Sequence, residues 1–281
     1  MAYEKMIGFF SPLSSCGNSL MTPSLKKMSR INIIAPAKQI DLTIIEQAAH
    51  ALSQEGFTIT FAKHIKSAPW HYFSSCDKNR LDDLQTAFND SDLDAIWCAR
   101  GGYGVIRLIN QLDLKSYLKH PSLVIGFSDI TILHCLLQAN NIPSVHGPMP
   151  ATYLTSTPLA KRSLHAVLKR SPIIYHFPSS HYNQSGQVTA PLVGGNLTIL
   201  TSLLGTPFAI NTDHKCLFIE DVNEPIYVIE RMLWQLKLAG KLNHIKALII
   251  GGLTDSADTS IPFGINLYEM IIQFMSFFKG P

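Results

Sequence analysis

The sequence predicts an α/β protein, with a parallel-sheet domain followed by a smaller α/β domain. Apolar, β-branched runs of strand length alternate with amphipathic segments of helical length along most of the chain. This alternation is typical of parallel strands joined by right-handed helical crossovers. Two of the predicted strands, 94–99 and 123–126, run directly into turns that contain glycine or serine. Ligand sites in such sheets lie beyond the carboxyl ends of the strands, so these turns are the first candidates for a functional site.

The composition indicates a compact protein of one large or two modest domains. The chain has 281 residues, of which 46% are hydrophobic and 15% charged. Its net charge of +3, on scattered lysines and arginines, argues against a nucleic-acid partner, and no apolar run is long enough to cross a bilayer. The five cysteines include no C-x-x-C pair, which favours a reducing compartment and no zinc site. We therefore expect a cytoplasmic protein without a metal, with Cys98 and Cys135 as buried thiols.

Residues 1–28 show no clear periodicity and are predicted to form a disordered leader. Leu13-Ser-Ser-Cys16 resembles the cleavage box of a bacterial lipoprotein. The apolar stretch before it is short, is interrupted by Pro12 and is preceded by an acidic residue, so it is a poor secretory signal.

Residues 29–150 are predicted to form the first domain, with a Rossmann- or flavodoxin-like parallel sheet. Asp41 is a typical helix N-cap, and the apolar stripe Ile44, Ile45, Ala48 and Leu52 predicts the helix that follows, which Gly56 ends. The expected strands are 30–36, 57–61, 94–99 and 123–126, and the expected helices are 41–52, 80–88, one from the glycine loop through Leu112, and one after Ser128.

Residues 151–186, rich in Pro, Ser, Thr and His, are predicted to connect the two domains, and residues 187–281 to form the second. An apolar helix in an α/β pattern normally leads into another strand, so we expect this domain to be truncated and to lack its last strand. Its expected elements are helices at 197–204, after Pro225 and at 267–278, and strands at 216–219 and 247–250.

The segment Gly126-Phe-Ser-Asp129 joins a predicted strand to a predicted helix without an intervening loop. A serine at so sharp a turn presents its hydroxyl away from the sheet, and the amides that follow it can face a developing oxyanion. This is the logic of a nucleophile elbow, although Ile130 replaces the second glycine of the G-x-S-x-G pattern. The alternative is that Ser128 or Asp129 only caps the helix, which is the usual role of a single serine in this position.

Arg100-Gly-Gly-Tyr-Gly104 follows the preceding predicted strand. Such glycines are typical of phosphate-binding loops, but no Gly-Lys-Ser/Thr follows and the spacing is not G-x-G-x-x-G, so a nucleotide site has weak support. A loop of backbone donors beside Ser128, with glycine to let a substrate approach closely, explains the composition better. A tight turn without a ligand explains the spacing as well.

A nucleophilic serine also needs a base and a carboxylate that orients the base. Glu220 ends an apolar strand and could orient a histidine, although an acidic residue there is more often solvated or a cap. His134 lies one helical turn beyond the elbow and is expected to point into the helix packing. His146 follows a further strand end and could line the cleft. Neither histidine has an evident connection to Glu220.

Taken together, these stretches resemble the LD-carboxypeptidase family, the serine peptidases of the muramoyltetrapeptide carboxypeptidase type, with microcin-immunity peptidases as relatives. The resemblance covers about residues 31–278, and its motifs are specific in their order and spacing. They are Ile96-Trp-Cys-Ala-Arg-Gly-Gly-Tyr-Gly104, Ile125-Gly-Phe-Ser-Asp129, His146-Gly-Pro-Met149, Gly194-Gly-Asn196, Leu217-Phe-Ile-Glu-Asp221, Ile229-Glu-Arg-Met232, Gly251-Gly252 and Ile261-Pro-Phe-Gly264.

The resemblance implies a Ser-Glu-His triad in which Ser128 is the nucleophile and Glu220 orients the base. It implies an oxyanion hole from the amides of Asp129 and Gly102, and a substrate cleft at Gly101, Tyr103 and His146. The implied reaction is hydrolysis of the bond between meso-diaminopimelate and terminal D-alanine in murein tetrapeptides during cytoplasmic wall recycling. No cofactor or metal is implied, and a homodimer is expected.

The family's histidine lies on a strand after the helix predicted at 267–278, so by this matching the base histidine is absent from the chain. Losing a triad member typically costs several orders of magnitude in rate. Two hypotheses follow: a serine LD-carboxypeptidase, either through a substitute histidine or as a truncated chain of an active enzyme, and a catalytically inactive peptide-binding remnant. A nucleotide-binding regulator that uses the loop at 101–104 has the weakest support.

Overall fold

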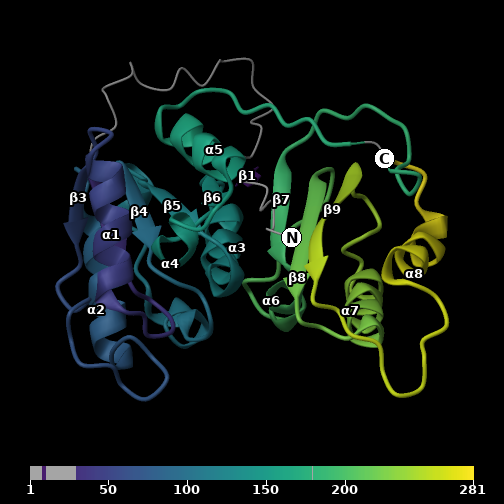
Figure 1. The fold of residues 1–281 in the computed structure, drawn as a ribbon, viewed down its shortest axis with the longest axis horizontal. Coiled ribbons are helices and arrows are strands. Elements are labelled where there is room, and N and C mark those ends of the chain that lie inside the picture. The colour runs from purple at the N-terminus through teal and green to yellow at the C-terminus, as the bar shows by residue number, and fades with distance from the viewer. Residues whose placement is uncertain (1–7, 11–29, 179) are drawn as a thin grey trace.

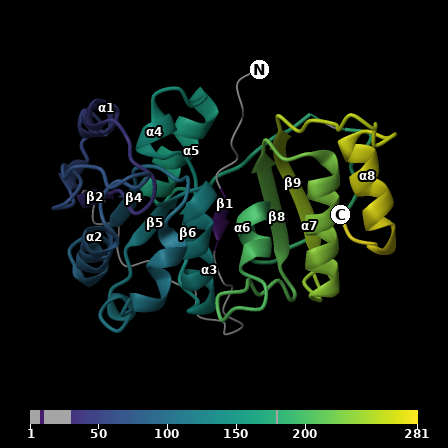
Figure 2. The same cartoon turned by 90° about the horizontal axis from the view of Figure 1, so that it is seen from below.

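The computed structural model describes residues 8–10, 30–178 and 180–281, which form two sheets side by side (Figures 1 and 2). Most of the predicted leader, with the lipoprotein-like Leu13–Cys16 segment, lies outside these residues. Within that leader, Gly8–Phe10 forms a strand, β1, and for these three residues the prediction of disorder is wrong. The strand pairs antiparallel with the first sheet, at the edge that faces the second sheet (Figure 2).

The first sheet confirms the predicted parallel α/β architecture. Its order is β1-β6-β5-β4-β2-β3, and all its pairings except β1–β6 are parallel. The neighbours of β2 are β3 and β4, so the direction of strand addition reverses beside β2. A crevice between the carboxyl ends of strands forms at such a switch point. The parallel strands are β2 (Arg30–Ile34), β3 (Thr58–Phe61), β4 (Ala95–Cys98), β5 (Leu123–Gly126) and β6 (Ser144–His146).

Helices cover both faces of this sheet (Figure 2). On one face, α1 (Leu42–Ser53), α4 (Pro150–Tyr153) and α5 (Pro158–Leu168) bury apolar side chains against residues such as Trp97. On the other face lie α2 (Asp77–Asn89) and α3 (Thr131–Ala139). Helix α5 and all of α4 except its first residue, Pro150, lie within 151–186, the segment predicted to connect the domains.

The second sheet is parallel, with the order β7-β8-β9. One continuous apolar cluster runs from α2 and α3 into the helices of this second sheet, so the two sheets share a core. At its outer edge, the Leu248 amide donates to the Pro281 carbonyl at 3.0 Å. The elements are β7 (Leu192–Asn196), α6 (Leu197–Ser202), β8 (Cys216–Val222), α7 (Ile226–Leu238), β9 (Ala247–Thr254) and α8 (Leu267–Phe274), the last followed by a 3₁₀ turn at Met275–Phe277.

Two local predictions are wrong for identifiable reasons. Ile44 is 38% exposed, whereas Ile45 is fully buried, because neighbouring residues of a helix point about 100° apart and the buried stripe passes to one side of Ile44. The helix expected through Leu112 is instead two short 3₁₀ turns, Val105–Arg107 and Ile109–Gln111. The amide of Val105 is bound by a side chain from the elbow, which fixes how this segment begins.

The predicted buried thiols are confirmed, since Cys98 and Cys135 are both buried and free. Burial raises the pKa of the Cys135 thiol to about 12, so it stays protonated at neutral pH. Within the part of the chain that the structure describes, no helix is both long and apolar enough to span a bilayer.

Candidate active site

Ser128 stands at the turn between β5 and α3 with a backbone φ of +62°. Left-handed backbone is uncommon for residues other than glycine and costs free energy, so the fold must impose it. Gly126 makes the sharp turn possible, because a Cβ there would lie 2.8 Å from Cγ1 of Ile130. Ile130 thus occupies the space that the missing side chain of Gly126 leaves. The strained serine of a nucleophile elbow is present even though the second glycine is not.

The glycine loop after β4 packs directly on this serine. A Cβ at Gly101 would lie 2.8 Å from Cβ and 3.1 Å from Oγ of Ser128, so any side chain at position 101 would displace the hydroxyl. Gly102, with φ +109°, is exposed beside it. The close approach explains why this turn requires glycine.

Two backbone amides beside Ser128 are open for a ligand. Within the described ranges, neither the Gly102 amide nor the Asp129 amide donates a hydrogen bond to another backbone group. The Ser128 hydroxyl, which is half-buried, likewise makes no hydrogen bond to a described residue. Gly102 is exposed, whereas Asp129 is buried. Backbone donors beside a serine oxygen can stabilise the oxyanion of a tetrahedral intermediate.

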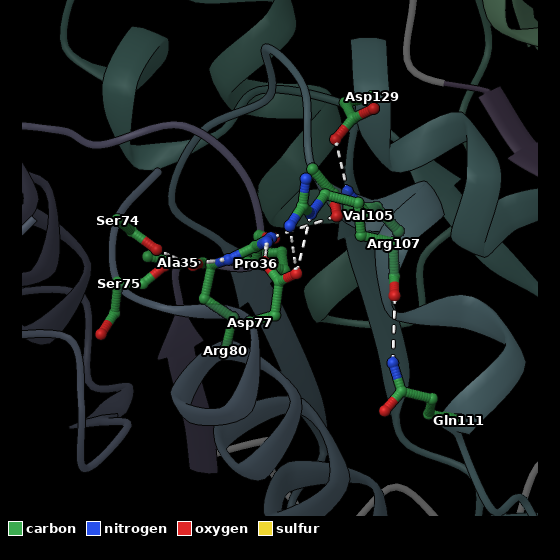
Figure 3. Close-up of polar contacts among 11 residues, drawn as sticks. Ala35, Pro36, Ser74, Ser75, Asp77, Arg80, Val105, Arg107, Gln111 and Asp129 are labelled. Carbon is green, nitrogen blue, oxygen red and sulfur yellow. Dashed lines mark hydrogen bonds and ion pairs between the residues drawn. The ribbon is translucent and has the colours of Figure 1, made fainter. Parts of the chain in front are cut away.

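A buried guanidinium supports the glycine loop from behind (Figure 3). Arg80, only 1% exposed, donates to the carbonyls of Ser75 (3.2 Å), Gly104 (3.1 Å) and Pro36 and pairs with Asp77. These carbonyls belong to three separate segments, so one side chain ties the loops after β2 and β4 to the start of α2. Burial lowers the pKa of Arg80, and its hydrogen bond to the Asp77 carboxylate opposes this.

Asp77 connects this cluster to a second arginine. Its carboxylate accepts from Arg107 Nε at 2.8 Å and pairs with Nη2 at 2.6 Å. Burial pushes the pKa of Asp77 upward, but the hydrogen bonds from Arg107 and Arg80 outweigh it and keep the pKa below its ordinary value. The ring of Phe73 contacts both guanidinium groups, with its centre 4.6 Å from Arg80 Cζ and 5.0 Å from Arg107 Cζ.

The carboxylate of Asp129 links the elbow to the loop from the other side. Its Oδ2 accepts from the Val105 amide at 3.0 Å, and its Oδ1 is buried without a hydrogen-bond partner among the described residues. Burial raises the pKa of Asp129 to about 6, and the Val105 amide and the Arg80 charge oppose that shift. Asp129 therefore presents its amide beside Ser128 while its side chain fixes the end of the glycine loop.

The second sheet brings Glu220 toward the first. Oε1 of Glu220 lies 3.8 Å from Nε2 of His146, which is buried at the end of β6. The two domains contact each other at Thr131, just after the elbow, and this contact brings Glu220 close to His146. The Thr131 hydroxyl accepts from the Asn196 amide at 3.1 Å, and a Cβ at Gly195 would lie 2.7 Å from the same oxygen.

Asp221, next to Glu220, fixes the end of β8. Its carboxylate accepts from Asn196 Nδ2 at 3.1 Å and from the amide and hydroxyl of Thr198, both at 2.8 Å. The register of β8 shifts between Ile219 and Asp221, so Glu220 stands at an irregularity of the strand. No connection between Glu220 and His146 was evident from the sequence. The structure corrects this, because the docking of the two sheets brings the two side chains together.

His134 points into the helix packing, as predicted. Its Nε2 lies 2.9 Å from the Gly126 carbonyl, and its Nδ1 lies 2.9 Å from Ser144 Oγ. Burial lowers the pKa of His134 to about 4, so the ring is neutral at physiological pH. With both nitrogens engaged below the elbow, His134 supports the turn.

The structure brings some predicted site residues together and leaves another at the rim. Ser128, Asp129, Gly101 and Gly102 form one contiguous group, and His146 and Glu220 form a second. Tyr103 is 48% exposed beside Phe73.

Sequence reasoning missed Arg80. A signal was available, because Arg80 lies four residues before the buried Leu84 on the apolar stripe of α2, where a charged residue needs buried partners.

One side-chain group among the described residues could bind a metal ion: His64, Asp82 and Asp83. Hydrogen bonds among these three residues already explain why they lie together. Asp83 accepts from the His64 amide at 3.0 Å, and Asp82 lies 3.0 Å from His64 Nε2. Its position after β3 is a loop cap of the kind that carboxylates commonly form.

Comparison with known proteins decides the family. The sequence profile for the LD-carboxypeptidase N-terminal domain matches residues 31–147, and that for the LD-carboxypeptidase C-terminal domain matches residues 189–279. The chain belongs to the LD-carboxypeptidase family. The matched segments include both glycine-containing turns and Glu220, so this is a serine-type carboxypeptidase, a hydrolase.

Relatives of this carboxypeptidase support the assignment along most of its length. A probable murein peptide carboxypeptidase of Bacillus subtilis is 36% identical over 81% of this chain and 73% of its own. A murein tetrapeptide carboxypeptidase of Pseudomonas aeruginosa is 34% identical over 80% and 77%. The crystal structure of muramoyltetrapeptide carboxypeptidase from Oxalobacter formigenes superposes with a TM-score of 0.79 at 26% identity, covering 90% of this chain and 86% of that one.

Replacing Arg80 by methionine tests the support of the glycine loop. The change leaves three carbonyls and Asp77 without their buried donor, so we expect the free energy of unfolding to fall by about 3–5 kcal/mol in urea titrations. The matched control is Arg162→Met, at an exposed site of α5, which we expect to change it by less than about 0.5 kcal/mol. Equal effects of the two substitutions would contradict the role of Arg80.

Replacing Asp129 by asparagine tests its buried carboxyl. An acid whose pKa is raised by folding stabilises the fold below its unfolded pKa, near 3.8, and loses that contribution as the pH rises through about 6. Asparagine retains the acceptor for Val105 but does not titrate. Between pH 4 and pH 7, we therefore expect the stability of the unchanged protein to fall relative to Asp129→Asn by at most about 3 kcal/mol. A difference that stays constant with pH would show that Asp129 is not buried as an acid.

Proposed function

We propose that this protein is an LD-carboxypeptidase that hydrolyses the bond between meso-diaminopimelate and the terminal D-alanine of murein tetrapeptides. The observation that carries the proposal is the strained Ser128 packed beneath Gly101, in a chain of this family. The names of the relatives from Bacillus subtilis and Pseudomonas aeruginosa support a murein peptide as the substrate.

In the proposed reaction, Ser128 Oγ attacks the carbonyl carbon of the diaminopimelyl–alanine bond. The amides of Gly102 and Asp129 donate hydrogen bonds to the carbonyl oxygen as negative charge develops on it. They are backbone groups of a loop fixed by Arg80 and Asp129, so little reorganisation is needed when that charge forms. D-Alanine leaves with a proton, and water then hydrolyses the ester on Ser128.

The base that takes the Ser128 proton acts next to Glu220 in this proposal. Glu220 orients an imidazole and stabilises its charged form, as the carboxylate of a triad does. His134 is excluded by its two contacts beneath the elbow. His146 lies on the Glu220 side of the site but is buried, so we assign the base to no described residue.

The setting of this activity is also a proposal. The resemblance and the relatives' names favour a role in cell-wall recycling in the cytoplasm, where the free Cys98 and Cys135 would remain reduced. A homodimer is proposed on the resemblance alone, and light scattering of the purified chain tests it.

The deciding experiment measures D-alanine release from murein tetrapeptide. It uses the 281-residue chain and a form extended past Pro281 by a strand that carries the family's histidine. We expect release that Ser128→Ala lowers on the order of 10⁴-fold or more, because the covalent route is lost. Ser116→Ala, at an exposed serine without a role in the site, is the matched control.

Each outcome of this assay has a distinct meaning. Release that depends on Ser128 supports the proposal, and release that survives Ser128→Ala contradicts the assignment of the nucleophile. Peptide binding without release from either form identifies a peptide-binding protein and overturns the proposed function.

A further inference from the structure

Lys38 lies at the switch point of the first sheet, next to the glycine loop. It follows β2, and Gly101 and Gly102 follow the adjacent strand β4. The Lys38 amide approaches the Gly101 carbonyl at 3.4 Å, so the two segments run side by side. Ligand sites of parallel sheets form between segments in this position.

The side chain of Lys38 covers Gly102. A Cβ at Gly102 would lie 2.7 Å from Cβ and 3.3 Å from Cδ of Lys38, and 3.1 Å from the hydroxyl of Tyr72. The Lys38 ammonium lies 4.9 Å from the centre of the Tyr72 ring, within the range of a cation–π contact. Tyr72 is itself positioned by the backbone, because its carbonyl accepts from the Gln39 amide at 3.2 Å. The ammonium is therefore held beside one proposed oxyanion donor.

Lys38 is a cation without a carboxylate partner in the described ranges. The neighbouring cations differ in this respect. Arg80 is committed to three carbonyls and Asp77, and Arg107 is paired with Asp77 as well. A half-buried ammonium with no internal counter-charge next to a reaction site is suited to bind an anionic group of the substrate.

We propose that Lys38, positioned by Tyr72, binds the free α-carboxylate of the residue that the enzyme removes. The proposal rests on the proposed function, since it places the scissile carbonyl between Ser128 and the amide of Gly102. The α-carboxylate of the terminal residue is only three bonds beyond that carbonyl carbon. An anchor for it must therefore lie immediately beside the oxyanion site, where Lys38 lies. The ion pair restricts cleavage to the last residue, because an internal peptide bond offers no carboxylate there.

Arg100 is the competing anchor. It is half-buried and directly precedes Gly101. Among the described residues, no hydrogen bond, ion pair or ring contact directs its side chain over the loop. Lys38 has such a contact with Gly102 and Tyr72, so we assign the carboxylate to Lys38. The experiment below includes Arg100 as a separate arm.

Binding measurements test this without requiring turnover. The full chain carrying Ser128→Ala is titrated in a calorimeter with murein tetrapeptide and with the same peptide ending in a carboxamide, so that only the terminal charge differs. We expect the free carboxylate to bind about 10–100-fold more tightly. Adding Lys38→Met should abolish this preference and leave the affinity for the carboxamide unchanged. Lys119→Met, at an exposed lysine, is the matched control and should retain the preference.

The remaining outcomes overturn the proposal. A preference that persists in Lys38→Met, or one that Arg100→Gln abolishes while Lys38→Met does not, assigns the carboxylate elsewhere. Equal binding of both peptides, or no binding of the free-carboxylate peptide, shows that no such anchor operates. D-Alanine release is measured separately, so a failure of the proposed reaction and a failure of the Lys38 anchor give different results.

Discussion

The close contact between Gly101 and Ser128 is the constraint on which the rest of the site depends. The missing side chain at position 101 lets the loop after β4 lie directly on the left-handed turn after β5. That contact brings the glycine loop, which includes the open amide of Gly102, against the serine. The Asp129–Val105 hydrogen bond and the buried Arg80 guanidinium support the two sides of the contact, so neither segment can move independently. Rigid support of this kind is what allows backbone dipoles to stabilise a developing charge.

The second sheet is positioned by the start of α3, directly after the elbow. Thr131, the first residue of α3 after the elbow, accepts the Asn196 amide and packs against Gly195. Because β7 is fixed there, its neighbour β8 brings Glu220 to within 3.8 Å of His146. One short helix start therefore positions both the strained serine and the carboxylate from a distant part of the chain. This arrangement explains why the apolar core runs continuously through both sheets.

Much of the fold followed from local patterns, and the misses have a common physical cause. Alternating apolar runs predicted the parallel sheet, and the Asp41 cap, which accepts from Thr43 at 2.8 Å, began α1 as expected. The irregular segment after Gly104 begins at a contact with the distant Asp129, so no local pattern could reveal it. The place of Arg80 on the apolar stripe of α2 signalled its burial, but its carbonyl partners are distant in sequence and could not be read from that pattern. The approach of His146 to Glu220 depends on how two sheets dock. The elbow was predictable because one tetrapeptide encodes it, whereas the roles of its residues stay predictions until they are measured.

Covalent labelling of the native chain tests most directly the central claim, that Ser128, half-buried beneath Gly101, is a nucleophile. After incubation with a fluorophosphonate, which reacts with activated serines, intact mass and peptide mapping identify the modified residue. The account predicts a single adduct on Ser128, formed on the order of 10²-fold more slowly in Gly101→Ala, where the new methyl group displaces the hydroxyl. An adduct on another serine, or equally fast labelling of Ser128 in Gly101→Ala, would contradict it.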